Sequence, residues 1–293
     1  MIFSQLTPHS AERIDLPGPY SRIAALRTTA AGKATVLLVP GYTGSKEDFA
    51  PLLDGIADAG LRAVAVDLPG QFESPGPPDE SVYLPAALGA VVVELVELLA
   101  VEGNPVLLLG HSFGGLVARA AVLAGAEVRG LTLLGSGPGA LPEGSRRKAL
   151  DLGEPLLREQ GLTAAYAVRE RVTARSSALS AELNDFHRQR FTSSSPFALL
   201  GMAEGLRREP DRVDALAERL SGRTPALVVA GEWDDAWSVP SQRDMAARLG
   251  APFALVGGAG HSPNTENPAG LLDVLLPTWL SWLDREQGGF TTE

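Results

Sequence analysis

Residues 106–115 read Val-Leu-Leu-Leu-Gly-His-Ser-Phe-Gly-Gly, and this stretch decides the fold that the sequence predicts. Its apolar start is typical of a strand that is covered on both faces, and residues 113–124 are predicted to form a helix. A serine at a direct strand-to-helix turn is the context in which Gly-x-Ser-x-Gly marks a nucleophile. Gly110 and Gly114 flank Ser112 at the two positions where the chain comes too close to itself for side chains. The stretch therefore predicts a strained turn that exposes Ser112.

Further apolar runs alternate with predicted helices on both sides of this stretch, which is the pattern of βα units and a parallel sheet. The predicted strands lie at residues 34–40, 61–67, 106–110, 128–134, 226–230 and 253–256. The predicted helices lie at residues 46–59, 82–101, 113–124, 242–249 and 269–283. Residues 13–26 are expected to add antiparallel edge strands. The sequence thus predicts an α/β fold with a mostly parallel, doubly wound sheet.

Residues 140–222 interrupt this alternation, because they contain no good strand and carry helical patterns rich in Arg and Glu. The segment lies between the fourth and fifth predicted strands, and this position favours a cap inserted into one domain over a separate helical domain. We predict a core formed by residues 1–139 and 223–293, with a helical cap (lid) at residues 140–222. Residues 288–293 are predicted to be a frayed tail.

A histidine base is needed beside Ser112, because serine alone is a weak nucleophile. Of the four histidines, His9 lies near the N-terminus and His187 lies in the predicted cap. His111 directly precedes the serine, so its side chain is expected to point elsewhere. His261 lies in a glycine-rich loop between the last predicted strand and the last predicted helix, where it can arch over the serine. We therefore predict His261 as the base.

The base in turn needs a carboxylate that holds its tautomer and stabilises the imidazolium. The strand predicted at residues 226–230 is followed by Gly-Glu-Trp-Asp-Asp at residues 231–235. Asp234 is the first choice and Asp235 is the alternative, whereas Glu232 lies nearer to the strand and should point away. The chain order of serine, acid and histidine is the one that accompanies such a serine turn.

Acyl transfer also needs N–H donors directed at the developing oxyanion. One predicted donor is the backbone N–H of Phe113, which directly follows the nucleophile. The other is the backbone N–H of Tyr42, in the loop Pro-Gly-Tyr-Thr-Gly at residues 40–44 that follows the first predicted strand. Gly41 allows the tight turn of this loop. These two N–H groups form the predicted oxyanion hole.

Composition narrows the classes of partner and cofactor. A net charge of −10 disfavours nucleic acid and anionic lipid, and the absence of cysteine excludes disulfides and thiolate sites. No histidine pair has metal-ligand spacing, so neither a metal nor another cofactor is expected. The longest apolar stretch, residues 82–101, carries two glutamates, and no signal peptide is recognised, so we expect no membrane span and a cytoplasmic protein. Nothing indicates an oligomeric state.

With these residues assembled, the chain resembles the α/β-hydrolase superfamily, in particular its capped esterase-like and haloperoxidase-like branch. The resemblance covers nearly the whole chain outside the cap. It rests on residues 40–44, 67–70, 110–115, 231–234, 260–263 and 266–268. It implies the α/β-hydrolase fold and the triad Ser112, Asp234 and His261. Related haloalkane dehalogenases and epoxide hydrolases carry an aspartate at the position of Ser112, so the resemblance disfavours those activities.

Three departures from the superfamily pattern stand out. Pro-Gly at residues 40–41 replaces the usual His-Gly, and Gln-Phe-Glu-Ser at residues 71–74 replaces the common His-Gly-x-Ser. Many relatives also have a proline four residues after the acid. Here Pro240 lies six residues after Asp234 and five after Asp235, so both aspartates stay open as the acid.

Together these features predict a cofactor-free serine hydrolase that cleaves a small or medium carboxylic ester through an acyl-enzyme. Its partner would be a small-molecule acyl substrate. The same triad serves a thioesterase, a lactonase, a carbon–carbon bond hydrolase or a peptidase, and the fold also occurs as a non-catalytic ligand receptor. These alternatives remain open.

Overall fold

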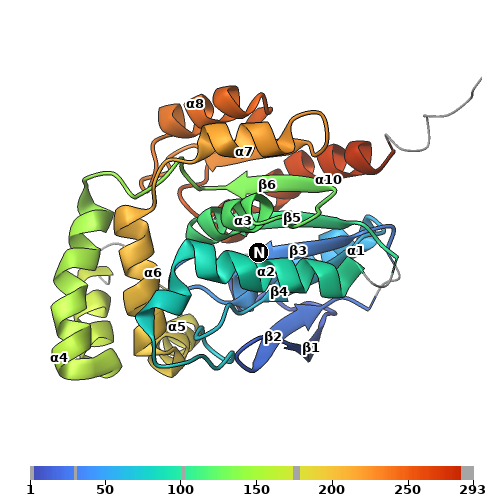
Figure 1. Cartoon of the computed structure of the whole chain (residues 1–293). Helices are drawn as coiled ribbons and strands as arrows, with labels where there is room; N and C mark the ends of the chain where they lie inside the picture. The colour runs from blue at the N-terminus through green and yellow to red at the C-terminus, as the bar shows by residue number, and fades with distance from the viewer. Residues whose placement is uncertain (1–2, 30–31, 101–102, 174–178, 285–293) are drawn as a thin grey trace, which may run out of the picture.

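The computed structural model describes residues 3–29, 32–100, 103–173 and 179–284. Within them, an eight-stranded sheet runs through the centre of the molecule, with helices on both of its faces (Figure 1). The strands are β1 (Glu12–Pro17), β2 (Arg22–Arg27), β3 (Thr35–Val39), β4 (Arg62–Val66), β5 (Val106–His111), β6 (Gly130–Leu134), β7 (Ala226–Gly231) and β8 (Phe253–Val256). Their order across the sheet is β1-β2-β4-β3-β5-β6-β7-β8.

The sheet is parallel from β4 to β8, while β1 and β2 join its edge in antiparallel pairing. This confirms the predicted mostly parallel sheet and the antiparallel edge strands. β5 lies between β3 and β6, with Val39 paired to Gly110 and His111 paired to Leu134. Because the strands are parallel, the loops that follow them all lie at the carboxyl ends of the strands. In open α/β sheets, ligands bind at these carboxyl ends.

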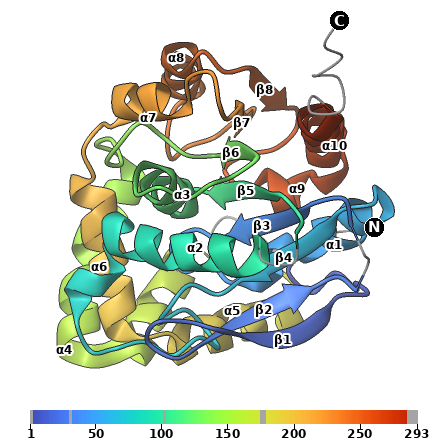
Figure 2. The same cartoon turned by 45° about the vertical axis from the view of Figure 1, so that its right-hand side comes forward.

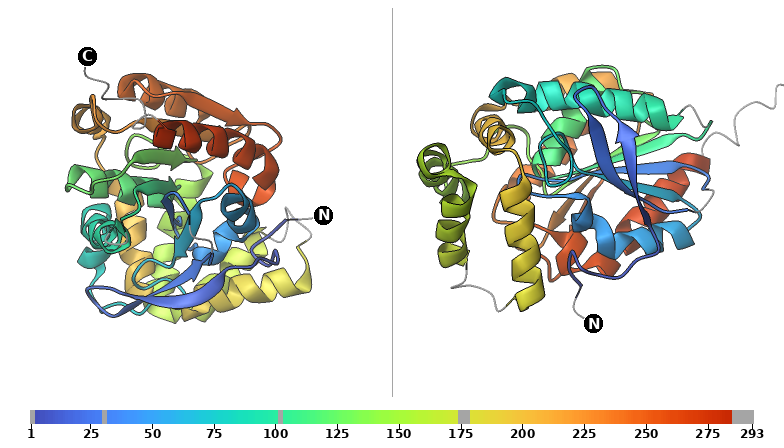
Figure 3. Two further views of the ribbon diagram at one scale, coloured as in Figure 1. Left: turned by 90° about the vertical axis from the view of Figure 1, so that its right-hand side faces the viewer. Right: turned by 90° about the horizontal axis from the view of Figure 1, so that it is seen from below.

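Two layers of helices cover the sheet (Figures 2 and 3). Residues of α1 (Ala50–Asp58) and α10 (Pro268–Asp284) form the apolar core on one face. Residues of α2 (Pro85–Ala100), α3 (Phe113–Leu123) and α8 (Val239–Leu249) contribute to the core on the other face. All five helices lie where the sequence predicts them, which confirms the doubly wound α/β architecture.

Several helix boundaries differ from the predicted ones, and prolines account for most of the differences. The helix predicted to begin at residue 46 starts as a 3-10 helix, η1 (Lys46–Phe49), and α1 follows with Pro51 in its first turn. The helix predicted to begin at residue 82 is preceded by η2 (Glu80–Tyr83), and α2 itself begins at Pro85. Proline lacks an N–H group and has a fixed φ, so it suits the first turn of a helix.

Four helices lie between β6 and β7, and the described part of residues 140–222 contains no strand, as predicted. They are α4 (Ser145–Thr173), α5 (Ala181–Ser193), α6 (Pro196–Arg208) and α7 (Val213–Leu220). Figure 1 and the right view of Figure 3 show α4, α5 and α6 beyond one end of the sheet. α7 instead packs against α3 and α8. The division into a core and a cap stays a prediction.

Two further features of the described residues bear on the sequence-based expectations. No helix in the described ranges combines the length and the apolar character that spanning a bilayer requires. The tail predicted at residues 288–293 lies outside the described part of the chain.

Candidate active site

Ser112 is the single residue between β5 and α3, as the sequence predicts. Its φ of 56° and ψ of −121° are an unusual conformation for a residue with a side chain, and such strain is concentrated at functional sites. A Cβ atom at Gly110 would overlap the carbonyl group of Gly114, and one at Gly114 would overlap the carbonyl group of Val39. Gly110 is therefore required for β5 to approach α3 at this turn, and Gly114 for α3 to approach the end of β3.

The structure brings Ser112, His261 and Asp234 into one hydrogen-bonded row. His261 Nε2 lies 2.8 Å from Ser112 Oγ, and His261 Nδ1 lies 2.9 Å from Asp234 Oδ1. These residues are separated by up to 149 positions in the sequence, and each is less than a tenth exposed. Burial excludes competing water and strengthens such polar contacts.

Three hydrogen-bond donors surround the carboxylate of Asp234. Asp234 Oδ1 accepts from the backbone N–H of Ala236 at 2.9 Å as well as from His261. Asp234 Oδ2 accepts from Gln242 Nε2, also at 2.9 Å. Burial alone would raise the pKa of Asp234, but the hydrogen bonds and the nearby His261 outweigh burial and lower it. The group is therefore a carboxylate at neutral pH, which makes His261 Nδ1 the donor in their contact.

The two other acidic candidates point elsewhere. Asp235 has a side chain that is 59% exposed and pairs with Arg146 of α4. Glu232 accepts a hydrogen bond through Oε2 from the backbone N–H of Gly258, at 2.8 Å. Of the two aspartates that the sequence leaves open, Asp234 is thus the one in contact with His261.

The loop that carries His261 is tied down on both sides of the histidine. Gly260 donates its N–H to the carboxylate of Glu266 in α9 (Pro263–Glu266), and Asn264 Nδ2 donates to the carbonyl oxygen of Asp48 at 2.7 Å. Asn267 Nδ2 donates to the carbonyl oxygen of Gly257 at 2.9 Å. These contacts hold the backbone from which the imidazole projects toward Ser112.

His111 has a role in the site that sequence reasoning missed. Its Nε2 donates to the carbonyl oxygen of His261 at 2.9 Å, although the residues are 150 positions apart. Burial, and secondarily the adjacent His261, lowers the pKa of His111 to about 4. The ring is therefore neutral at pH 7, with its proton on Nε2 because a carbonyl oxygen can only accept. In the sequence, only its position directly before Ser112 could have indicated that His111 belongs to the site.

The predicted oxyanion loop runs alongside the serine. A Cβ atom added to Gly41 would lie 3.0 Å from Ser112 Cβ and 3.4 Å from Ser112 Oγ, so the backbone at Gly41 borders the nucleophile. Gly44 donates its N–H to the carbonyl oxygen of Gly41 at 3.0 Å and closes the turn. Phe113 is the first residue of α3, where backbone N–H groups have no partner within the helix and the dipole favours negative charge.

Tyr42 connects this loop to the helices beyond the end of the sheet. Its side chain packs against a small apolar cluster formed by residues of α4, α5 and α6. The members of the cluster are Leu157, Ala165, Tyr166, Phe191, Leu199 and Leu200. Burial raises the pKa of Tyr42 to about 12, so its phenol stays protonated throughout the physiological range. The side chain of Tyr42 thus lies between the loop and these helices.

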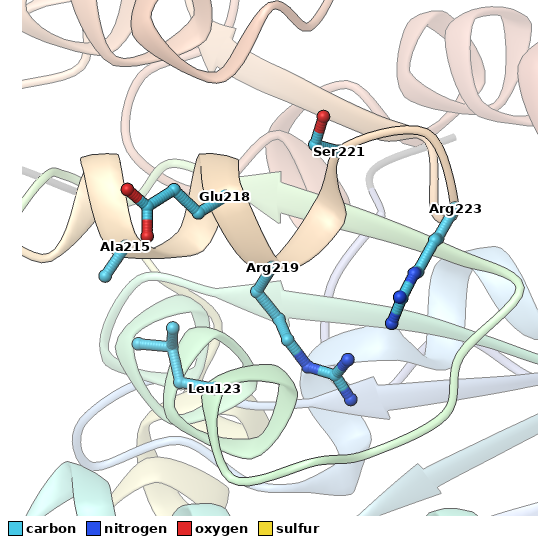
Figure 4. A pocket seen from close by; sticks show the side chains of 6 residues that line it. All are labelled: Leu123, Ala215, Glu218, Arg219, Ser221 and Arg223. Carbon is cyan, nitrogen blue, oxygen red and sulfur yellow. The ribbon is translucent and has the colours of Figure 1, made fainter.

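A separate open hollow lies between α3 and α7 and contains none of the predicted catalytic residues (Figure 4). It is lined by Leu123, Ala215, Glu218, Arg219, Ser221 and Arg223. Over the described ranges, no three His, Asp or Glu side chains are grouped so that they could hold a metal ion. The expected lack of a metal and of other cofactors stays a prediction.

Comparison with solved structures shows the same architecture in several hydrolases. A thermophilic esterase from Thermogutta terrifontis aligns with a TM-score of 0.72 at 22% identity, over 93% of this chain and 99% of that one. A carboxylesterase from Nitrososphaera gargenis gives 0.74 at 17% identity, over 93% and 100%. The N-acyl homoserine lactonase AidH gives 0.69 at 23% identity, over 97% and 99%. At these identities the likeness concerns the fold.

The match to a family covers most of the chain. The sequence model of the alpha/beta hydrolase family matches residues 36–274. This range includes the strand-to-helix turn, the segment between β6 and β7, and the loop of His261. The eight-stranded sheet and the position of Ser112 agree with that match. This chain therefore belongs to the alpha/beta hydrolase family.

Proposed function

We propose that this protein is a serine hydrolase that cleaves small or medium carboxylic esters through an acyl-enzyme on Ser112. The observation that carries the proposal is the hydrogen-bonded row from Ser112 Oγ through the imidazole of His261 to Asp234. A serine hydroxyl becomes an effective nucleophile when such a base takes its proton. Similar structures that include an esterase and a carboxylesterase are in keeping with it.

The proposed acylation step begins with His261 in its neutral form. Nδ1–H donates to the carboxylate of Asp234, so the lone pair on Nε2 is free to accept the proton of Ser112. The serine oxygen then attacks the carbonyl carbon of the ester, and the carbonyl oxygen becomes an oxyanion. Asp234 stabilises the imidazolium that results.

The backbone N–H groups of Tyr42 and Phe113 would bind the oxyanion, because Phe113 directly follows Ser112 and Tyr42 directly follows Gly41, whose backbone borders Ser112. Collapse of the tetrahedral intermediate expels the alcohol, which takes the proton from His261 Nε2. Water then attacks the acyl-enzyme with His261 again as the base, and the acid leaves as Ser112 regains its proton. The cycle uses no group beyond the chain, the ester and water.

The test is turnover of a p-nitrophenyl ester by the wild-type protein and by two serine variants. Ser112→Ala is expected to lower kcat/KM by about 10³-fold or more, because the nucleophile is removed. Ser221→Ala, an exposed serine in the hollow between α3 and α7, is the matched control and should retain wild-type turnover. Unchanged hydrolysis by Ser112→Ala would refute the assignment.

The substrate class is tested with a panel of p-nitrophenyl esters, acyl thioesters and acyl homoserine lactones. We expect the highest kcat/KM for an ester of short or medium acyl length. The proposed substrate class would be wrong if a thioester or lactone gave a kcat/KM at least tenfold higher than the best ester. If that turnover also required Ser112, the proposed triad would still stand.

A further inference from the structure

The side chain of Gln71 joins three parts of the molecule behind the oxyanion loop. It is fully buried in the turn that follows β4. Gln71 Oε1 accepts from the backbone N–H of Leu68 at 3.0 Å, and Gln71 Nε2 donates to the carbonyl oxygen of Gly41 at 2.8 Å. Nε2 also lies 3.8 Å from Met202 Sδ of α6. The orientation of the amide is determined by chemistry, since its oxygen faces a donor and its nitrogen faces a carbonyl.

The Gly41 carbonyl belongs to the same peptide group as the N–H of Tyr42, the proposed oxyanion donor. This peptide is trans, and in a planar trans peptide the C=O and N–H bonds point in opposite directions. The direction of the Gly41 carbonyl therefore determines the direction of the Tyr42 N–H. Gln71 Nε2 and the N–H of Gly44 both hold that carbonyl, while Gly41 itself borders Ser112.

We propose that Gln71 is a positioning residue for the oxyanion hole: by holding the Gly41 carbonyl, it aims the Tyr42 N–H at the oxyanion that forms on Ser112-bound substrate. This inference rests on the proposed function and deepens it. Gln71 occupies one of the positions where the sequence departs from the superfamily pattern, and its amide reaches the carbonyl directly.

The turn that carries Gln71 is itself held by the segment between α5 and α6. The N–H of Ser195 donates to the carbonyl oxygen of Gly70 at 2.7 Å, and the N–H of Phe72 donates to Ser194 Oγ at 3.1 Å. Phe72 has a φ of 39°, a conformation that side chains disfavour and that these contacts maintain. These hydrogen bonds hold the backbone on both sides of Gln71, whose amide donates to the Gly41 carbonyl.

The size of the expected effect follows from what remains when the amide is removed. Loss of a whole oxyanion-hole donor lowers kcat by about 10²- to 10³-fold. Without Gln71, the Gly41 carbonyl still accepts from Gly44, so the Tyr42 N–H would be aimed less accurately rather than lost. We expect kcat to fall by about 10- to 100-fold, with KM changing by less than about threefold, since the oxyanion is absent from the bound ester and forms only as the reaction proceeds.

The experiment compares Gln71→Met with Ser74→Ala. Methionine matches glutamine in length, but it can donate neither to the Gly41 carbonyl nor to Met202 Sδ. Ser74 is a buried residue of the same loop whose Oγ donates to the Asp67 carbonyl at 2.8 Å and accepts from the Ala24 N–H at 2.9 Å. Its loss weakens the loop without touching Gly41, so Ser74→Ala should retain kcat within about threefold.

Two further measurements distinguish a loss of oxyanion-hole geometry from a general loss of folded structure. A trifluoromethyl ketone, whose adduct with serine places an oxyanion in the hole, should bind Gln71→Met more weakly by about the same factor as kcat/KM falls. Gln71→Glu keeps the shape of glutamine, and its protonated form can donate to the Gly41 carbonyl. Burial raises the pKa of a carboxyl group, so the activity of Gln71→Glu relative to wild type should rise as pH falls, whereas that of Gln71→Met should not.

Three results would overturn the role of Gln71 in an active enzyme. These are a wild-type kcat in Gln71→Met, an equal loss in Gln71→Met and Ser74→Ala, or a loss confined to KM. Should Gln71→Met not fold, as judged by thermal melting, the pH profile of Gln71→Glu decides, and a flat ratio to wild type refutes the role. A wild-type protein without Ser112-dependent turnover refutes the proposed function instead, and this is seen before any Gln71 variant is made.

Discussion

Replacing Asp234 with asparagine is the most informative single change at the acid position. All three groups that face the carboxylate are donors: His261 Nδ1, the N–H of Ala236 and Gln242 Nε2. Asparagine carries one acceptor and one donor where the aspartate has two acceptors. Its NH2 group must therefore face a donor, whichever way the amide is turned.

Each orientation of the new amide has a definite cost. With NH2 toward His261, the imidazole must present a lone pair at Nδ1 and carry its proton on Nε2, so it cannot take the proton of Ser112. With NH2 toward Gln242, two buried donors oppose each other, at about 1–3 kcal/mol, and the imidazolium loses its counter-charge. In serine proteases the corresponding change costs about 10⁴-fold in kcat, or about 5 kcal/mol in the activation barrier. We expect about 10³- to 10⁴-fold here.

The assay is steady-state hydrolysis of a p-nitrophenyl ester by Asp234→Asn and Asp235→Asn, measured side by side. The Asp235 side chain is mostly exposed and pairs only at the surface with Arg146, a kind of contact worth about 0–1 kcal/mol. Asp235→Asn should therefore keep kcat within about twofold. A large loss of kcat in Asp235→Asn together with a wild-type kcat in Asp234→Asn would show that the acid has been misidentified.

Two further predictions concern stability. Because burial lowers the pKa of His111 to about 4, the unfolded state binds this proton first, and the free energy of unfolding should fall by up to about 3 kcal/mol as pH drops from about 6.5 to 4. Urea unfolding of His111→Gln should show a smaller loss over this range, and an identical loss would contradict the burial of a neutral ring. Burial raises the pKa of Asp67 to about 7, so this group is tested at about pH 8, where it is a carboxylate. There Asp67→Ala should lower the free energy of unfolding by about 3 kcal/mol or more, because Lys46, only 1% exposed, loses a buried carboxylate 3.0 Å from its Nζ. A loss below about 1 kcal/mol in urea would contradict this, since Glu47 and Glu73 would then be sufficient partners for Lys46.

The turn at Ser112 could be predicted from sequence because all its determinants are local. An apolar run, two glycines at fixed distances from the serine and a helical stretch describe a strand, a turn and a helix without reference to the rest of the chain. The same holds for the sheet, whose strands appear as separate apolar runs. The predicted start positions of the helices were less accurate, because 3-10 helices precede α1 and α2.

The choice between Asp234 and Asp235 could not be made from sequence, because the two neighbouring residues have the same chemistry. They differ in where their side chains point, which the sequence does not show. The structure shows what separates them: Asp234 Oδ1 accepts from the N–H of Ala236, two residues ahead, and this local turn directs the carboxylate inward. Asp235 faces α4 and Arg146. A turn of this kind depends on backbone angles that side-chain identity alone does not specify.

The contacts of His111 and Gln71 were also beyond sequence reasoning, for a related reason. Each donates to a backbone carbonyl oxygen, that of His261 or Gly41, in a loop distant along the chain. A carbonyl group is present at every position, so no residue type marks it as a partner. Only the packing of loops at the edge of the sheet brings donor and acceptor together.

The central claim is that Ser112 is the nucleophile activated by His261, and covalent labelling tests it most directly. The native protein is treated with a fluorophosphonate and digested, and the modified peptide is identified by mass spectrometry. We predict a single adduct, on the peptide that contains Ser112, that is absent from Ser112→Ala and strongly reduced in His261→Ala. No adduct on the native protein, or equal labelling of native protein and Ser112→Ala, would contradict the account.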